Sequence, residues 1–208
     1  MRVSDLLTLM GTLSVGNDNI APAERAIFLQ YLNLAHLELY QATANLNQDL
    51  ITREDLAGPQ GTVTLPQTPY LVSAVYNVVD RHPLTRFSPV DAAGHGLAGV
   101  SQPFGYVLQK NVISFVPPQT SPVSVIVWYV PQPLPLTEET REEDIPYPMA
   151  YHPVLADGAL HYLFQEEGGF KSSPKSQEAK ERWEIGKSKL LSYLYSSSGQ
   201  ALSTFSSA

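Results

Sequence analysis

Apolar residues recur every three or four positions in two long stretches, one near each end of the chain. Within residues 22–47 the recurring positions are Phe28, Leu32, Ala35, Leu39, Ala42 and Leu46. Within residues 176–195 they are Ala179, Trp183, Gly186, Leu190 and Tyr193. This spacing places the side chains of each stretch on one face of an α-helix. The pattern therefore predicts a long amphipathic helix near each end.

Two shorter helices are predicted beside the long ones. Ser4 can cap the first, which buries apolar residues as far as Leu13 and ends in the polar cluster 16–19. The second spans residues 153–167, from a proline suited to a first helical turn to a pair of glycines. Gly158 lies inside it, where glycine costs about 1 kcal/mol relative to alanine. We therefore expect Gly158 to mark a close contact with another helix.

The middle of the chain has a different pattern, in which prolines and glycines separate short runs rich in β-branched residues. These runs predict strands at residues 62–65, 71–79, 106–109, 112–116 and 123–130. Lys110 and Asn111 separate two alternating runs, which indicates a hairpin. The nearly continuous apolar run at 123–130 is typical of a central strand. The segment is therefore predicted to form a small antiparallel sandwich or a partly closed barrel.

Together these elements predict an α+β fold, a helical body into which a β domain is inserted. The helical body is expected to comprise residues 1–57 and 138–195, and the β domain residues 58–137. The acidic run at 138–144 is interpreted as a solvated linker. The serine-rich residues 196–208 are predicted to form a flexible C-terminal tail.

Composition narrows the function. The chain carries 13 basic and 20 acidic residues, a formal net charge of -7. This charge disfavours a protein that grips nucleic acid by neutralising phosphates. The absence of cysteine excludes disulfides and thiolate metal sites. No stretch is long and apolar enough to span a membrane, and no signal peptide is expected.

Few residues are arranged for chemistry. His152 and His161 are nine positions apart, a spacing that does not bring them onto one helix face as a metal pair requires. Asp157 is four positions before His161 and is expected to contact it or a partner. His95 is interpreted as a solvated loop residue. We expect no catalytic residues, no metal and no cofactor, and interpret Trp128 and Trp183 as core residues.

The order of elements resembles that of the head-to-tail adaptor (connector) proteins of tailed bacteriophages. The resemblance covers nearly the full chain and lies in FLQYLNLAHLELYQ, in YVLQKNVISFVPPQTSPVSVIVWYVPQPLPLT and in EEDIPYPMAYHPVLADGALHYLFQEE. Similar proteins share a step like Asn33-Leu34-Ala35 and a tyrosine that ends the valine-rich strand, here Tyr129. The resemblance implies a structural virion protein at the head–tail junction, made in the host cytoplasm, and no enzyme.

The resemblance also implies partners. Such proteins form a homo-oligomeric ring of about twelve copies under the portal protein, with heterologous contacts between copies. The ring continues the channel for double-stranded DNA towards the tail or nozzle proteins. On this basis the helices at 22–47 and 153–167 are expected to pack around the ring.

Four residues are candidates for docking on the portal. Lys187 and Lys189 belong to a locally basic last helix, which can meet an acidic portal surface or passing DNA, or can be a solvated face. Leu202 and Phe205 are isolated apolar residues in the polar tail, able to anchor it once it is buried. The alternative function is a carbohydrate-binding or hydrolytic virion protein that uses the β domain.

Overall fold

The chain folds into two compact units. The computed structural model describes residues 1–16, 20–58, 61–94, 102–167 and 174–204, without the side chains of Val15, Glu167 and residues 199–204. Residues Met1–Gln48 and Pro133–Ala208 form a helical unit, and residues Asp49–Gln132 form a β unit. Helices lie at both ends of the chain and the sheets lie in its middle, so the predicted α+β class is confirmed.

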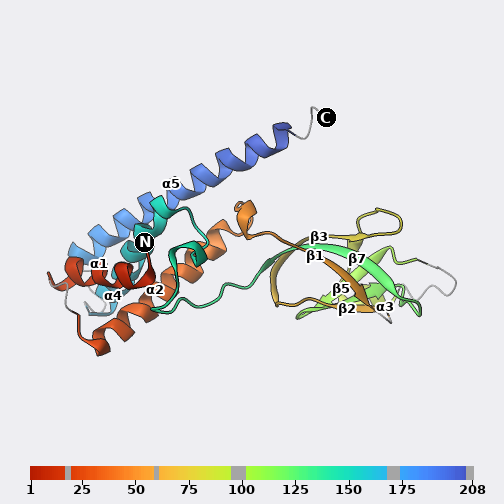
Figure 1. Ribbon diagram of the computed structural model, residues 1–208, viewed down its shortest axis with the longest axis horizontal. Helices are drawn as coiled ribbons and strands as arrows, with labels where there is room; N and C mark the ends of the chain where they lie inside the picture. The colour runs from red at the N-terminus through yellow and green to blue at the C-terminus, as the bar shows by residue number, and fades with distance from the viewer. Residues whose placement is uncertain (17–19, 59–60, 95–101, 168–173, 205–208) are drawn as a thin grey trace. The chain divides into compact units, whose positions relative to one another are not determined.

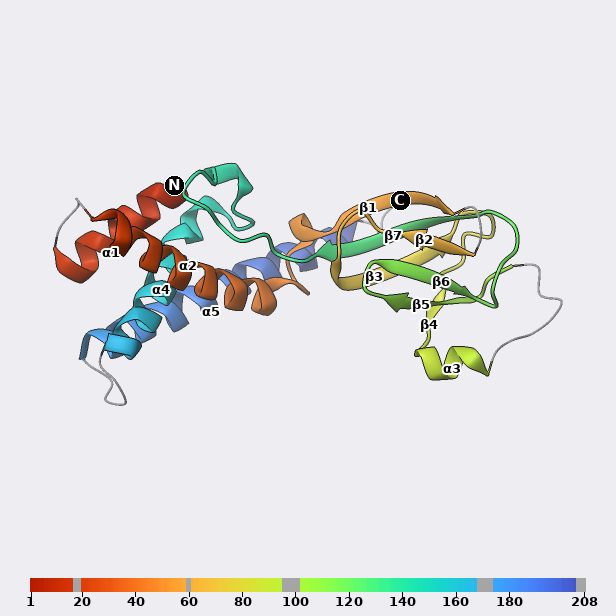
Figure 2. The same cartoon turned by 90° about the horizontal axis from the view of Figure 1, so that it is seen from below.

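Four helices build the helical unit. They are α1 (Val3–Val15), α2 (Pro22–Thr43), α4 (His152–Glu167) and α5 (Pro174–Thr204). Helix α4 is central, because it packs against α1, α2 and α5 (Figure 1, Figure 2). The 3-10 turns η2 (Glu142–Asp144) and η3 (Met149–Tyr151) precede α4, and η1 (Gln48–Leu50) lies where α2 is followed by the β unit.

The core of the helical unit is organised around Trp183. This side chain of α5 is completely buried. A Cβ atom on Gly158 of α4 would lie 2.8 Å from the Trp183 ring and 3.0 Å from Cβ of Ala35 on α2. Only glycine leaves the space in which these three helices meet, so the expectation for Gly158 is confirmed.

Helix α1 begins differently from the prediction. Its N-cap is Arg2, whose backbone N–H donates to the Asp5 carboxylate over 2.9 Å, and Ser4 lies inside the helix. Gly16 ends it in the left-handed conformation, with φ 70°, as glycine readily does. Leu6 and Met10 are buried, whereas Leu13 is exposed, so the predicted burial of Leu13 is wrong.

The β unit consists of two sheets around one core. Strands β1 (Thr52–Gly58), β7 (Val123–Pro131) and β3 (Pro69–Asn77) form a three-stranded sheet in that order. The second sheet has the order β2 (Thr62–Thr64), β6 (Val112–Val116), β5 (Gly105–Gln109), β4 (Thr85–Arg86). All pairs are antiparallel except the short β4–β5 pair, and helix α3 (Pro89–Ala93) follows β4.

Two β predictions are confirmed. Strands β5 and β6 form the hairpin, with Gln109 opposite Val112 and Lys110 at φ 56° in the turn. Strand β7 is central in its sheet. Its inward side chains, Val125, Val127 and Tyr129, pack in the core with residues from the other sheet.

Trp128 corrects the core assignment. It is 39% exposed because β7 alternates, and its neighbours Val127 and Tyr129 occupy the core side. The guanidinium of Arg53, the paired residue on β1, lies 5.8 Å from the centre of the Trp128 ring. The continuous apolar run concealed the alternation, because the outward positions are apolar as well.

Strand β1 and the end of α5 escaped sequence analysis. Strand β1 has the sequence TREDLAG, in which inward positions carry Thr and Glu beside Leu56, so an apolar alternation is absent. Helix α5 continues to Thr204, through residues expected to be a flexible tail. Serines are weak helix formers, but extending an existing helix fixes one residue for each added hydrogen bond.

The Gly158 contact predicts a specific mutational effect. Gly158→Ala gains helix propensity, yet the added methyl group overlaps the Trp183 ring, and overpacking costs about 1–3 kcal/mol. We expect a net loss of about 1 kcal/mol in the free energy of unfolding, and a larger loss for Gly158→Val. Urea unfolding followed by Trp183 fluorescence in a Trp128→Phe background isolates the helical unit.

The matched control is Gly94→Ala in the β unit, whose new Cβ would meet only the Asp91 carbonyl oxygen at 3.4 Å. Followed by Trp128 fluorescence, it should unfold close to the unsubstituted protein. Equal stability of Gly158→Val and the parent chain would contradict the packing described for Trp183.

Candidate functional site

The segment that leads into α4 is fastened along α2 by side-chain amides. We call residues 133–151 the return segment. Asn33 of α2 donates Nδ2 to the Leu136 carbonyl over 3.0 Å and accepts the Leu136 N–H over 2.7 Å. Asn47, which follows α2, donates to the Pro146 carbonyl over 2.9 Å. These bonds give an irregular segment the partners that a buried backbone requires.

Histidine and tyrosine side chains complete the attachment. The Tyr147 hydroxyl donates to the His36 carbonyl over 3.2 Å and lies 3.3 Å from His36 Nδ1. His152 Nε2 lies 2.8 Å from the Tyr147 carbonyl oxygen. His152 is buried, and its Nδ1 is 3.3 Å from the Met1 carbonyl oxygen. Both ring nitrogens of His152 therefore contact backbone carbonyl groups of the same chain.

His36 was missed in the sequence and proves to be a buried titratable residue. It lies in edge-to-face contact with the rings of Tyr40 and Tyr147. Burial lowers the pKa of His36 to about 4, although a backbone hydrogen bond with Leu134 opposes the shift. Its position in the apolar period of α2 was the available signal, since a polar residue there must find partners inside the fold.

The other predicted chemical groups do not converge. Asp157 pairs with Arg182 of α5, with 2.8 Å between Oδ1 and Nε, rather than with His161. His161 Nδ1 is buried and finds no hydrogen-bond partner among the residues that the structure describes. His95 lies outside the described residues. Among the described residues, no group of three His, Cys, Asp or Glu side chains is placed to hold a metal ion.

Lys187 is committed to the helical unit. Its Nζ lies 2.9 Å from a carboxylate oxygen of Glu38 on α2 and 2.9 Å from one of Glu184. The side chain is only 17% exposed, and the ammonium group lies 5.3 Å from the centre of the Trp183 ring. Partial burial lowers the pKa of Lys187, but the hydrogen bonds and charges of the two glutamates outweigh it and raise that pKa.

Glu38 joins three elements. Burial raises the pKa of Glu38, but hydrogen bonds from Tyr162 and Lys187 outweigh it and hold the pKa below its ordinary value. The Tyr162 hydroxyl donates to Glu38, and burial with this bond raises the pKa of Tyr162 to about 12. The carboxylate therefore ties α2 to α4 and α5.

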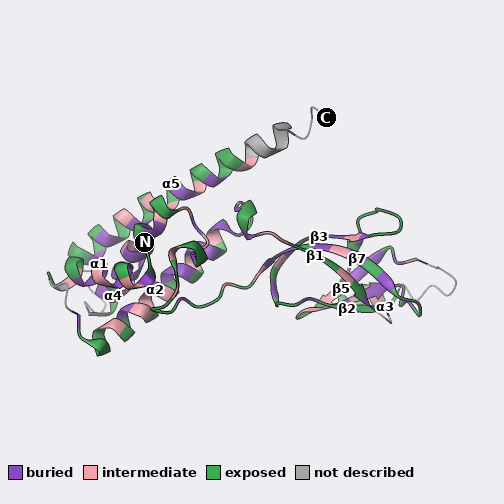
Figure 3. Cartoon of the chain, viewed as in Figure 1, coloured by how far each residue is buried: buried purple, intermediate pink, exposed green. Residues whose placement is uncertain are grey.

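The remaining partner-contact candidates lie towards the end of α5. Lys189 is exposed and forms no ion pair among the described residues. Leu202 lies in the helix, in the part whose side chains are not described, and Phe205 lies outside the described residues. Leu194 is the last residue of α5 that is described as buried, and Figure 3 shows how buried and exposed positions alternate along this helix. The helix continues for about 15 Å after Leu194, to Thr204.

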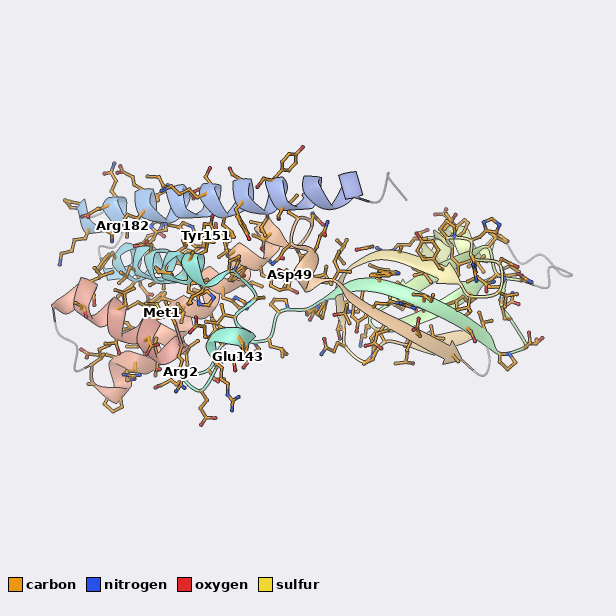
Figure 4. The ribbon with its side chains drawn as sticks, turned by 45° about the horizontal axis from the view of Figure 1, so that its top comes forward. Met1, Arg2, Asp49, Glu143, Tyr151 and Arg182 are labelled. Atoms are coloured by element: carbon orange, nitrogen blue, oxygen red, sulfur yellow. The ribbon has the colours of Figure 1, made fainter. Side chains whose placement is uncertain are left out.

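The acidic run at 138–144 is attached to the body, so its interpretation as a solvated linker is wrong in part. Glu138 pairs with Arg25 of α2 over 3.1 Å, and the Val3 N–H donates to the Thr140 carbonyl over 3.4 Å. Glu139 and Glu143 remain exposed. In Figure 4, Glu143 lies on one side of the helical unit and Arg182 of α5 on the opposite side.

Exposed apolar side chains remain on α2 after the chain has folded. Ile27, Leu34 and Leu37 are 45%, 50% and 42% exposed. We call these three residues the α2 stripe. In contrast, the apolar residues of α4 are buried within the chain: Val154, Leu155, Ala156, Ala159, Leu160, Leu163 and Phe164. The surface left for partners lies on α2 and α5 rather than on α4.

Most of the polar side chains described above bind other parts of the same chain, and exposed apolar side chains remain on α2. Comparison with known families identifies the chain. The family model described as the SU10 adaptor protein matches residues 1–198. The chain therefore belongs to this family of phage head–tail adaptors, and it is a structural protein of the virion. No curated protein matches the chain. Within the described part of the chain, no helix is long and apolar enough to cross a membrane.

The Asn33 bonds predict a structural role for the Asn33-Leu34-Ala35 step. Asn33→Ala leaves the Leu136 N–H without its partner, and we expect the free energy of unfolding to fall by about 1–3 kcal/mol. Hydrogen exchange of the Leu136 amide should accelerate at the same time. Gln30→Ala, on the exposed side of the same helix, is the control and should change neither. Unchanged exchange at Leu136 in Asn33→Ala would rule out the proposed fastening.

The buried His36 predicts a pH dependence. Its pKa is lower in the folded protein than in the unfolded chain, so the unfolded chain takes up the proton first as the pH falls. The stabilisation is complete above the unfolded value of about 6.5 and is lost towards the folded value of about 4. Between about pH 6.5 and about pH 5 the loss should approach about 2 kcal/mol.

The measurement is urea unfolding of the helical unit across this pH range. The variant His36→Phe should show a clearly smaller pH slope, whatever its absolute stability. His82→Phe, a substitution of an exposed histidine in the β unit, should retain the slope. Parallel slopes for His36→Phe and the parent chain would assign the pH dependence to other groups.

Proposed function

We propose that this adaptor forms a closed ring under the portal protein, continues the DNA channel and presents a docking surface to the tail or nozzle proteins. Membership of the adaptor family carries the proposal. Family membership gives association with portal and tail proteins in general terms. Beyond this general association, we propose that the copies close into a ring, that the ring has about twelve copies, and that it contacts the portal.

The exposed surfaces of the helical unit support a ring. A closed ring of identical copies needs two different contact patches on each copy. The α2 stripe and the outer side of α5 are two such patches, whereas the apolar residues of α4 are buried within the chain. The expectation that the 153–167 helix packs around the ring is therefore refined: its role is to hold α2 and α5 in place.

The net charge of -7 supports a passive channel. Duplex DNA is polyanionic, and binding to it is driven by basic side chains that displace counterions. An acidic chain can surround DNA without this attraction, which would slow its passage. The proximity to DNA that we propose is therefore non-specific.

The end of α5 is proposed as the portal-docking arm. Residues 190–204 contain no charged side chain, and Tyr195 is 72% exposed. Leu202 and Phe205 are the proposed anchors, each contributing about 1.5–3 kcal/mol if fully buried on docking. Of the two candidate lysines, Lys187 is held by Glu38 and Glu184 within the chain. Docking of the arm on the portal is therefore proposed to rest on Leu202 and Phe205, and Lys189 is left for an acidic surface of a neighbouring copy.

The carbohydrate-binding alternative requires aromatic rings that are exposed together. In the β unit Tyr106, Phe115 and Tyr129 are buried, and Arg53 lies over the exposed Trp128. These observations favour the adaptor function over this alternative.

The test is electron microscopy of the chain bound to its portal. We expect a closed ring against the portal, and isolated copies on the portal would contradict the proposal.

Truncation after Tyr195 tests the arm: it should weaken portal binding at least tenfold. Its fold should persist, because the truncated chain keeps every residue of α5 that is described as buried, the last of which is Leu194. If the truncated chain binds the portal as tightly as the full chain, the proposed docking arm is wrong, whereas the proposed ring is unaffected.

A further inference from the structure

The distribution of charge limits where two copies of this chain can touch. The helical unit carries 9 basic and 15 acidic residues, a net charge of -6, and the β unit carries 4 basic and 5 acidic residues, a net charge of -1. Copies with this charge repel one another. Contacts between helical units therefore belong on uncharged surfaces, or where an acidic patch meets a basic one.

The α2 stripe is one such uncharged surface. Residues 27–37 contain no acidic or basic side chain except His36, which is buried. Ile27 and Leu34 are seven positions apart and Leu37 follows three later, so the three lie on one side of α2. The stripe presents large aliphatic side chains to solvent.

The outer side of α5 is the second surface. Ile185, Ser188, Ser192 and Ser196 are all exposed, and the serines recur every four positions, so they share one side of the helix. We call these four residues the α5 serine face. Small side chains let another helix approach closely, and large side chains of that helix fill the space above them.

The elements next to the two surfaces carry charges of opposite sign. The return segment is hydrogen-bonded to α2 through Asn33, and it exposes Glu139 and Glu143, of which Glu143 also lies 3.7 Å from Arg141. Lys189 borders the α5 serine face, and α5 carries 5 basic and 3 acidic residues, a net charge of +2 in a unit that is otherwise -8. Glu143 lies on the side of the helical unit opposite α5 (Figure 4), whereas Tyr151 at the end of the return segment packs against Tyr193 of α5.

We infer that the α2 stripe of one copy receives the α5 serine face of a second copy of this chain, with Lys189 directed at Glu139 and Glu143. The inference rests on the proposed ring and names its contact. Leucine and isoleucine side chains pack against serines, and the flanking charges fix the direction. Because the two patches are different, the contact joins unlike surfaces of successive copies and does not pair a patch with itself.

Disulfide trapping tests this contact, and the cysteine-free chain gives a clean background. Leu34→Cys is combined in turn with Ser188→Cys, Ser192→Cys and Ser196→Cys, and portal-bound rings are oxidised with diamide. We expect at least one combination to give a ladder of linked species beyond the dimer. Each single variant should stay unlinked. Val90→Cys with Ser192→Cys is the control and should give no ladder, because Val90 is exposed on the β unit.

The outcomes separate this inference from the proposed function. If the parent chain forms no ring on the portal, the proposed function fails. If rings form and no combination gives a ladder, the contact is wrong. If Leu34→Cys alone gives dimers, the α2 stripes face one another, which also overturns it. If the portal and not a second copy covers the α5 serine face, Ser192→Cys should form a disulfide with a cysteine placed on the portal. This result would also overturn the inferred contact.

A charge exchange gives an independent measurement. Lys189→Glu should raise the concentration for half-maximal ring assembly at least threefold, and Glu139→Lys with Glu143→Lys should do the same. Combining all three substitutions should restore assembly towards the parent value. Lys110→Glu in the β5–β6 turn is the matched control and should have no effect. Additive loss in the combined variant would contradict the pairing.

Discussion

Trp183 can occupy the centre of the helical unit only because residue 158 of α4 has no side chain. The ring fills the space that a Cβ atom would take, and Ala35 of α2 approaches the same point. This contact brings α2, α4 and α5 together. The Glu38–Lys187 pair beside it depends on the same approach, because its two residues come from α2 and α5. The small residues of the sequence are thus the condition for the close packing of the large ones.

As a consequence of this packing, the helices differ in how much of their surface is exposed to solvent. The apolar residues of helix α4 are buried within the chain, whereas α2 and α5 each have one side in the core and one side in solvent. The return segment is irregular, and it is fixed by hydrogen bonds from Asn33, Asn47 and Tyr147 rather than by its own secondary structure. An adaptor needs such a body, since its outer surfaces meet several partners and its interior must hold their positions.

Periodicity predicted the long helices and the hairpin well, because each has one continuous apolar face. It failed where the pattern and the environment differ. Strand β1 is an edge strand that carries charged residues, so it lacks the apolar alternation expected of a strand. Trp128 lies within a nearly continuous apolar run, which does not show that its side chain points outward. The candidate contact residues were harder to predict, because a sequence does not show which lysine forms an ion pair within its own chain. Lys187 and Lys189 are two positions apart, yet only Lys187 faces Glu38.

The β unit begins and ends on neighbouring strands. Thr52 near the start of β1 is paired with Tyr129 near the end of β7. The chain therefore enters and leaves the unit at one place, and the helical unit is interrupted at a single point between α2 and the return segment. A module connected in this way can be lengthened, exchanged or lost over evolution while the helices keep their order and their core. The two units are thus free to diversify at different rates.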